Sequence, residues 1–282
     1  MDINNSKLTI EEVNKTIAKL KQKVSDNKTK PILTQIFNCI DLTSLNTDDT
    51  EDKILKLTQR VNKLSSNTSI PNVAAICVYP TMVSTVKKNL KVPNLNIAAV
   101  AACFPSSQTY LSIKLAECEI VLNKGANEID IVLSVGKFLE GNYHYCTTEI
   151  TMIKQLLAHN HLKVILETGI LQDLNHIYNA SILSLEAGAD FIKTSTGKTS
   201  ISATPEAVYS MCTAIKDYYN KTGEKKGIKA SGGISTSEEA ILYYLIVEKV
   251  LGKEWLNNKL FRFGASRLAN NVLKDIDESI VF

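Results

Sequence analysis

Short runs of apolar and β-branched residues recur along the chain, separated by segments with apolar residues at helical spacing. Two of these segments, LSIKLAECEIVLNKG and TTEITMIKQLLAHN, have the pattern of amphipathic helices. Regular alternation of strand and helix is typical of a parallel sheet, and eight such units predict an α/β protein with the (β/α)8 fold, a TIM barrel. The predicted strands lie near residues 36–41, 74–79, 96–103, 128–134, 163–168, 191–196, 228–231 and 261–264.

One barrel domain accounts for the length of the chain. Its 282 residues are 44% hydrophobic, which suffices for one large core, so we expect a single catalytic domain over residues 31–282. Residues 1–30 contain the helical pattern LTIEEVNKTIAKLKQKV and are predicted to form an N-terminal helical extension that covers the bottom or the side of the barrel. We assign no chemistry to this extension.

A doubly wound sheet would give the same alternation of strands and helices. The positions of the polar residues favour the barrel, because Asp41, Asp130, Lys193 and Lys229 fall within or near the C-terminal halves of four predicted strands. Barrel enzymes assemble their active sites at that end of the strands. The four side chains are therefore expected to point at one pocket.

A lysine interrupts the sixth predicted strand, in the stretch FIKTSTGK at residues 191–198. Strand alternation sends Phe191, Lys193 and Ser195 to one face, which carries the amine into a packed interior. A buried ammonium pairs with a carboxylate or loses its proton, and a neutral lysine amine is a nucleophile for carbonyl compounds. The chemistry indicated is that of a class I aldolase, which forms a Schiff base. The alternative is a structural lysine whose stem packs while its amine reaches water.

A second lysine, Lys229, precedes the Ser-Gly-Gly turn of GIKASGGI one βα unit later. If the two strands are neighbours, its charge disfavours protonation of Lys193. Lowering a lysine pKa from about 10.4 to near 7 requires about 4 kcal/mol, which burial and one close cation can supply. Asp130, in the apolar strand sequence IDIV, also needs a partner if it points inward. Neutralisation of Lys229 is the structural alternative for that carboxylate.

The chain resembles the deoxyribose-phosphate aldolase family in seven motifs that follow one another at βα spacing. Beside the two lysine motifs they are IDLTSLN, AAICVYP, NEIDIV, LETGIL and FRFGAS, and they span nearly all of the chain after residue 30. The resemblance implies reversible cleavage of 2-deoxy-D-ribose 5-phosphate to D-glyceraldehyde 3-phosphate and acetaldehyde, in deoxyribonucleoside catabolism. It further implies Lys193 as the Schiff-base residue, with Lys229 and Asp130 relaying protons, no metal or organic cofactor, and a homo-oligomer.

The resemblance also places Asp41 near the substrate hydroxyl or the lysine network, and Cys77 nearby. Each has a structural alternative: DLTSLN also fits a turn or cap, and an apolar thiol in a strand is usually part of the core. The phosphate end of the substrate has signals of its own, since three consecutive strands end in glycine-containing turns whose backbone N–H groups can hold an anion. The predicted phosphate and substrate contacts are Thr196, Gly197, Lys198, Gly232, Gly233, Gly264 and Ser266.

Three positions depart from the family pattern. Arg267 stands where many members have a second serine, and it either strengthens phosphate binding or faces solvent. The segment AACFPSSQT replaces a commoner Thr-Asn before Phe-Pro, which changes the expected substrate contacts after the third strand. The chain ends in SIVF, so proton transfer by a C-terminal tyrosine is not predicted.

Composition disfavours several other classes of function. A net charge of +3 without a basic stripe gives no support for nucleic-acid binding, and no apolar stretch reaches the length of a membrane span. Six scattered cysteines indicate reduced thiols in the cytoplasm, and four histidines show no metal-ligand spacing. Two alternatives stay open: a class I aldolase for a different phosphorylated sugar, and a non-catalytic barrel that binds a sugar phosphate.

Overall fold

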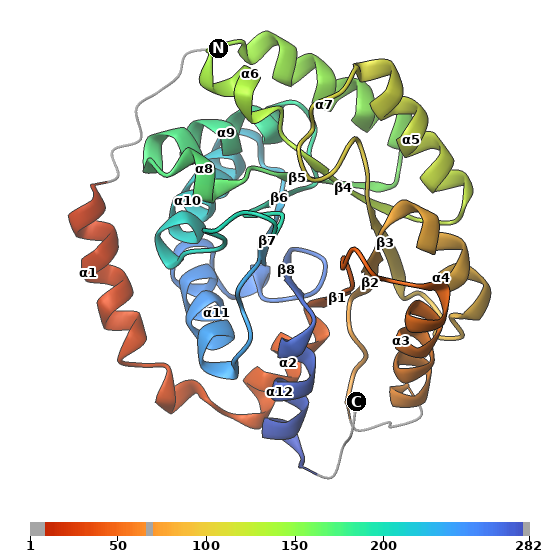
Figure 1. Cartoon of the computed structure of the whole chain (residues 1–282). Coiled ribbons are helices and arrows are strands. Elements are labelled where there is room, and N and C mark those ends of the chain that lie inside the picture. The colour runs from red at the N-terminus through yellow and green to blue at the C-terminus, as the bar shows by residue number, and fades with distance from the viewer. Residues whose placement is uncertain (1–8, 66–69, 279–282) are drawn as a thin grey trace.

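Eight parallel strands form a closed barrel in chain order in this computed structural model, which describes residues 9–65 and 70–278 (Figure 1). The last strand pairs with the first, with Asp41 opposite Gly264, and this closure excludes the doubly wound sheet. The predicted (β/α)8 fold is confirmed. The strands are β1 (Ile40–Thr43), β2 (Ala75–Val78), β3 (Asn96–Val100), β4 (Glu128–Val132), β5 (His161–Ile165), β6 (Phe191–Lys193), β7 (Gly227–Ser231) and β8 (Phe261–Ala265).

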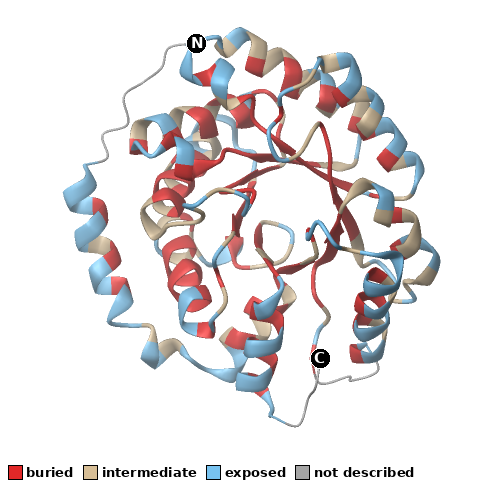
Figure 2. Ribbon diagram, viewed as in Figure 1, coloured by how far each residue is buried: buried red, intermediate tan, exposed pale blue. Residues whose placement is uncertain are grey.

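Helices surround the barrel and turn their buried faces toward it (Figure 2). Between the strands lie α3 (Glu51–Leu64), α4 (Val83–Asn89), α5 (Leu111–Asn123), α6 (Val135–Leu139), α7 (Tyr143–Leu157), α8 (Thr168–Leu171), α9 (Leu174–Glu186), α10 (Pro205–Thr222) and α11 (Ser237–Leu251), and α12 (Arg267–Ile276) follows the last strand. Short 3-10 turns occupy Ser25–Asn27, Pro80–Met82 and Lys253–Trp255. Thr236 and Glu239 form a capping box that fixes the start of α11.

The prediction for the first strand was wrong in its position. Residues Lys30–Asn38 form a helix, α2, and the strand begins only at Ile40. Pro31 sits in the first turn of α2, and the buried residues Leu33, Ile36 and Phe37 recur at helical spacing. Ile36 and Phe37 thus belong to the buried face of a helix, and the predicted strand starts too early.

The N-terminal helix α1 (Ile10–Lys21) lies outside the ring and packs against α10 and α11, so it covers the side of the barrel (Figure 1). Thr9 caps it by accepting a hydrogen bond from the backbone N–H of Glu12, and Val13, Ile17 and Leu20 are buried against the barrel helices. The division of the chain at residue 30 stays a prediction. The segment SIVF at residues 279–282, on which the C-terminal expectation depended, lies outside the described residues.

Candidate active site

Lys193 and Lys229 lie opposite one another on the adjacent strands β6 and β7. Both side chains are buried, with Lys193 2% exposed and Lys229 fully enclosed. The carboxylate of Asp130, on β4, lies between them: its Oδ2 accepts hydrogen bonds from Lys193 Nζ at 2.8 Å and from Lys229 Nζ at 2.9 Å. The three side chains singled out as the chemical centre therefore form one contact group inside the barrel.

The two lysines have opposite electrostatic environments. Burial lowers the pKa of Lys193, and the charge of Lys229 lowers it further, against the opposing effect of Asp130. Burial also opposes the charged form of Lys229, but Asp130 and Asp41 outweigh it and raise the Lys229 pKa above its usual value. Lys193 is thus the lysine suited to act as an uncharged nucleophile, and Lys229 the one that stays charged.

Asp41 and Cys77 lie beneath the cavity and do not line it. Asp41 on β1 is fully buried and accepts hydrogen bonds from Lys229 Nζ at 2.6 Å and from Arg262 Nη1 at 2.6 Å. Cys77 on β2 is also fully enclosed, and burial raises the pKa of its thiol although Lys229 and Lys193 oppose this. The structure places both beside the lysine network, while a direct substrate contact stays a prediction for each.

The ionic cluster continues deeper into the barrel through three residues to which the sequence analysis gave no role. Lys163 on β5 donates to Glu128 Oε2 at 2.6 Å and to Asp130 Oδ1 at 2.9 Å. Arg262 on β8 donates to both oxygens of Glu128, at 3.2 and 2.9 Å, and to Asp41. Lys163 in HLKVI and Arg262 in FRFGA each place a charge within an apolar strand, which is the same signal that marked Lys193.

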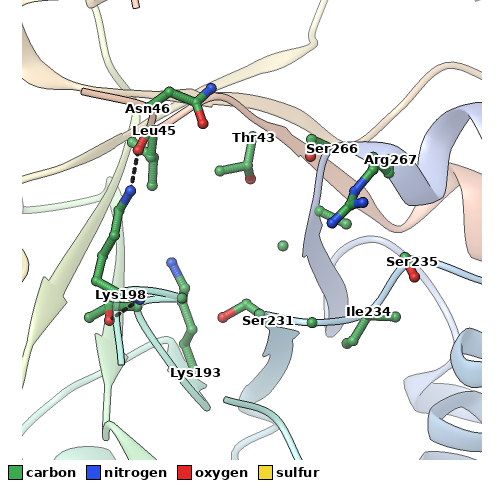
Figure 3. Close-up of a pocket in the computed structure, with 16 residues that line it drawn as sticks. Thr43, Leu45, Asn46, Lys193, Lys198, Ser231, Ile234, Ser235, Ser266 and Arg267 are labelled. Carbon is green, nitrogen blue, oxygen red and sulfur yellow. Dashed lines mark hydrogen bonds between the residues drawn. The ribbon is translucent and has the colours of Figure 1, made fainter. Parts of the chain in front are cut away.

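Above this cluster a cavity opens at the C-terminal ends of the strands, with Lys193 in its wall (Figure 3). Its volume is about 210 Å³, and each of the predicted phosphate and substrate contacts outside the barrel core lies in its lining. The lining comprises Thr43, Leu45, Asn46, Lys193, Thr196, Gly197, Lys198, Ser231, Gly232, Gly233, Ile234, Ser235, Gly264, Ala265, Ser266 and Arg267. The AACFPSSQT segment is outside this lining, and four of its residues, 106–109, line a separate cavity together with Ser134 and Lys137.

The glycines of the cavity wall allow two strand ends to approach closely. Gly197 and Gly232 have positive φ angles of 75° and 87°. A Cβ atom on Gly232 would meet Ser202 Oγ at 2.5 Å and the Gly197 Cα at 3.4 Å. A side chain at this position would therefore strain the backbone and push the two loops apart. The exposed backbone of these turns is suited to hold an anion.

Three polar groups lie around the cavity, with Ser266 and Arg267 on one side and Lys198 on the other (Figure 3). The guanidinium of Arg267 is exposed and points toward the open space, and Ser266 lies next to it at the start of α12 (Figure 3). The Nζ of Lys198 donates to the backbone oxygen of Leu45, and its backbone N–H donates to Thr196 Oγ1 at 3.0 Å. Cationic side chains and the first turn of a helix favour an anionic ligand group here.

Glu167 supports the loop that follows Lys193, and sequence analysis assigned it no role. It adopts a left-handed backbone conformation with φ of 56°, is 4% exposed, and accepts hydrogen bonds from the backbone N–H of Thr196 at 3.2 Å and from Thr196 Oγ1 at 2.5 Å. The carboxylate thereby holds the β6 end of the cavity. The motif LETGIL includes Glu167 but does not reveal this contact, because the partner is 29 positions away.

Two kinds of feature are absent from residues 9–65 and 70–278. These residues include no group of three or more His, Cys, Asp or Glu side chains that could hold a metal ion. None of their helices is long and apolar enough to cross a bilayer.

Comparison with known proteins gives one consistent family. Residues 36–254 match the model described as DeoC/LacD family aldolase. The chain is 39% identical to the deoxyribose-phosphate aldolase of Homo sapiens over 84% of this chain and 78% of that protein. It is 43% identical to a Caenorhabditis elegans relative that carries the same name provisionally, over 94% of this chain and 88% of the relative.

Two solved structures share the fold of this chain. A Toxoplasma gondii protein with the same provisional name superposes with a TM-score of 0.79 at 20% identity, over 88% of this chain and 95% of that one. The deoxyribose phosphate aldolase of Aeropyrum pernix, whose structure is described as tetrameric, gives 0.71 at 23% identity over 92% and 97%. At these identities the likeness concerns the fold.

Proposed function

The chain belongs to the DeoC/LacD aldolase family, and from this premise we propose that it is a class I deoxyribose-phosphate aldolase. Its reaction is the reversible cleavage of 2-deoxy-D-ribose 5-phosphate to D-glyceraldehyde 3-phosphate and acetaldehyde. The observation that carries the proposal is the position of Lys193, an amine with a lowered pKa in the wall of a cavity. Gly232, Ser266 and Arg267 line the same cavity and can hold a phosphate.

In the proposed reaction the amine of Lys193 adds to the C1 aldehyde, and the carbinolamine loses water to give an iminium ion. The C3 hydroxyl gives up its proton and the C2–C3 bond breaks. The electron pair of that bond moves into the iminium, which becomes an enamine as D-glyceraldehyde 3-phosphate leaves. A proton then adds to C2, and water hydrolyses the resulting iminium to acetaldehyde and the free amine.

We assign the proton transfers to Lys229 and Asp130. Lys229 stays charged because its carboxylate neighbours raise its pKa, so it can donate a proton. Asp130 contacts both amines through one oxygen, which places a carboxylate beside the atoms that gain and lose protons. Its pKa is held well below the usual range, since Lys163, Lys193 and Lys229 outweigh the effect of burial. Asp130 therefore stays ionised and accepts hydrogen bonds from both amines.

We infer that the phosphate occupies the side of the cavity formed by the ends of β6, β7 and β8. The backbone of Gly197, Gly232 and Gly233 is open there, and Lys198 and Arg267 supply positive charge. The sugar chain then extends from this anion site toward Lys193 (Figure 3). Asp41 acts from below the cavity through its contact with Lys229, and Cys77 acts through its electrostatic interaction with the two lysines.

We further propose that this reaction serves the catabolism of deoxyribonucleosides, in the cytoplasm, and that the chain forms a homo-oligomer. A tetramer described for the Aeropyrum pernix relative supports the last point. Light scattering on the purified protein tests it, and a monomer at all concentrations would contradict it.

Product analysis tests the proposed function. We expect acetaldehyde and D-glyceraldehyde 3-phosphate in equal amounts from 2-deoxy-D-ribose 5-phosphate, and neither product with Lys193→Met. Cleavage of a different phosphorylated sugar alone would assign the chain another aldolase activity. Binding of the sugar phosphate without cleavage would indicate a non-catalytic barrel.

A further inference from the structure

Seven ionisable side chains form one continuous buried cluster along the axis of the barrel. Every one of them is at most 2% exposed, and each contacts at least one other member by a hydrogen bond or an ion pair. They are Asp41, Glu128, Asp130, Lys163, Lys193, Lys229 and Arg262. Lys193 lines the cavity, while Arg262 and Glu128 lie at the other end of the chain of contacts.

Three of these side chains are carboxylates and four are cationic, so the cluster as described carries one more potential positive charge than negative charges. Three of the cations each contact two or more carboxylates. Lys229 contacts Asp41 and Asp130, and Arg262 contacts Asp41 and Glu128. Lys163 contacts Glu128 and Asp130 and lies 3.6 Å from Asp41 Oδ2.

Lys193 contacts Asp130 alone among the three carboxylates of the cluster, and Lys163 and Lys229 already occupy the two oxygens of that side chain. The surplus charge therefore falls on Lys193. Unbalanced charge in a poorly solvated interior is costly, and loss of one proton removes it.

We propose that Arg262 is a positioning residue that keeps Lys193 uncharged. Its permanent positive charge pairs with Asp41 and Glu128, so these carboxylates do not stabilise a proton on Lys193. The inference rests on the proposed function, for which an uncharged Lys193 is required. Arg262 needs no contact with substrate to act in this way. Its guanidinium balances the negative charge of carboxylates that would otherwise favour the protonated form of a nearby lysine. Lys193 is the lysine that has the fewest carboxylate contacts and therefore loses its proton most readily.

The geometry holds Arg262 in one position. Its Nε donates to the backbone oxygen of Asn258, and its guanidinium lies 5.5 Å from the ring centroid of Phe191. Phe191 precedes Lys193 by two positions on β6, so the two side chains project from the same face of the strand. A guanidinium is also permanently protonated in proteins, unlike a lysine amine. Arg262 can therefore serve as a fixed charge across the working pH range.

The charged and titratable groups that surround Lys193 or belong to its cluster come from most strands of the barrel. They are Asp41 on β1, Cys77 on β2, Glu128 and Asp130 on β4, Lys163 on β5, Lys229 on β7 and Arg262 on β8. At the far end the half-exposed His161 contacts Glu128 Oε1 at 3.3 Å. The charge count above takes His161 as neutral.

The pH dependence of the nucleophile tests the proposal without relying on turnover. Acetaldehyde is trapped on Lys193 by cyanoborohydride over a range of pH, and the adduct on the peptide that contains Lys193 is quantified by mass spectrometry. The wild type is compared with Arg262→Met, with Glu128→Gln and with the double variant. Circular dichroism establishes that each variant is folded.

We expect Arg262→Met to raise the midpoint of trapping by about one pH unit or more, which is about tenfold slower trapping at a fixed pH below the midpoint. Removal of a carboxylate by Glu128→Gln is expected to lower the midpoint. The double variant loses one charge of each sign and is expected to return toward the wild-type value. A purely structural role for Arg262 would slow trapping equally at every pH.

Arg262→Lys is the matched control, because it keeps the charge while losing the two-pronged contact with Glu128. Its midpoint is expected to stay near that of the wild type. If Arg262→Met does not fold, a lowered midpoint for Glu128→Gln with an unchanged one for Arg262→Lys still supports the proposal. Equal midpoints in the wild type, Glu128→Gln and every other folded variant would overturn it. Absence of an adduct on wild-type Lys193 would instead contradict the proposed function.

Discussion

Lys193 and Lys229 bind the same atom, Oδ2 of Asp130, at 2.8 and 2.9 Å. One carboxylate oxygen shared by two amines cannot neutralise both, and Lys229 has a second carboxylate in Asp41 at 2.6 Å. Lys229 therefore keeps its proton, and Lys193 is the amine that loses one. This unequal sharing distinguishes the roles of two lysines that occur in similar sequence contexts.

A methyl group on Gly264 is expected to disturb the lysine pair from the neighbouring strand. Its Cβ would lie 2.7 Å from Ser231 Cβ and 3.0 Å from Lys229 Cε. Such overpacking costs about 1–3 kcal/mol, so Gly264→Ala should lower kcat/KM at least about tenfold with a reduced melting temperature. Gly136→Ala is the control, since a Cβ there meets nothing within 4 Å. Unchanged steady-state kinetics for Gly264→Ala would contradict the packing described for Lys229.

Arg267→Met is expected to weaken binding of the substrate phosphate without changing the chemistry. The guanidinium points into the cavity opposite Lys193 (Figure 3). Loss of one charge-assisted hydrogen bond corresponds to about 1.5–3 kcal/mol, or a KM for 2-deoxy-D-ribose 5-phosphate raised by about tenfold or more. The internal control is unphosphorylated 2-deoxy-D-ribose, for which kcat/KM should not change. An equal loss with both sugars would place the phosphate elsewhere.

Glu167→Gln tests the support of the loop after β6. The carboxylate accepts hydrogen bonds from Thr196 N–H and Thr196 Oγ1 and is almost fully buried. The amide can keep one of these contacts, so we expect a loss of about 1–3 kcal/mol in the free energy of unfolding, together with a lower kcat. Thr199→Ala is the control: of the hydrogen bonds to this carboxylate it removes the one of 3.3 Å, and it also removes an exposed one of 3.0 Å to the backbone oxygen of Ile201. Equal stability of the two variants in urea would rule out this supporting role.

Stability in acid should depend on the buried carboxylates. Although burial acts in the opposite direction, Lys163 and Arg262 hold the pKa of Glu128 well below its usual range. The folded state therefore binds fewer protons than the unfolded state does. The stabilisation by Glu128 is complete above the unfolded-state pKa of about 4.3 and is lost as pH falls toward the folded-state value.

Urea unfolding at a series of pH values measures this dependence. Glu128→Gln should reduce the slope of unfolding free energy against pH below about pH 4. Asn96→Ala is the matched control, because it removes a hydrogen bond of 2.7 Å to Glu128 but no titratable group. It should lower stability and keep most of the wild-type slope, because Lys163 and Arg262 still lower the pKa of Glu128. If Glu128→Gln and the wild type had the same slope, the pKa of Glu128 would not differ between the folded and the unfolded state, and the account of this carboxylate would be wrong.

The sequence predicted the strands well where an apolar run had no competing pattern. Each of the eight predicted strands overlaps one of the structure, but the first was predicted to start at residue 36, and Ile36 and Phe37 belong to α2. Those two residues suit a strand and a buried helix face equally, and the choice depends on tertiary packing of α2 against α11 and α12.

The cavity lining could be predicted because glycine turns at strand ends are local signals. The deeper ionic cluster could not, although Lys163 and Arg262 each interrupt an apolar strand. Their partners follow from the closure of the barrel, which brings β8 beside β1 and so places Arg262 against Asp41. Glu167 lies within the motif LETGIL, but its supporting role could not be predicted, since it depends on a left-handed turn.

The central claim is that Lys193 forms the Schiff base, and borohydride reduction in the presence of 2-deoxy-D-ribose 5-phosphate or acetaldehyde tests it most directly. Peptide mass mapping of the reduced protein should find the adduct on Lys193 and none in the Lys193→Ala variant. An adduct on Lys229 or Lys198, or an equal adduct in the variant, would contradict the assignment of the nucleophile.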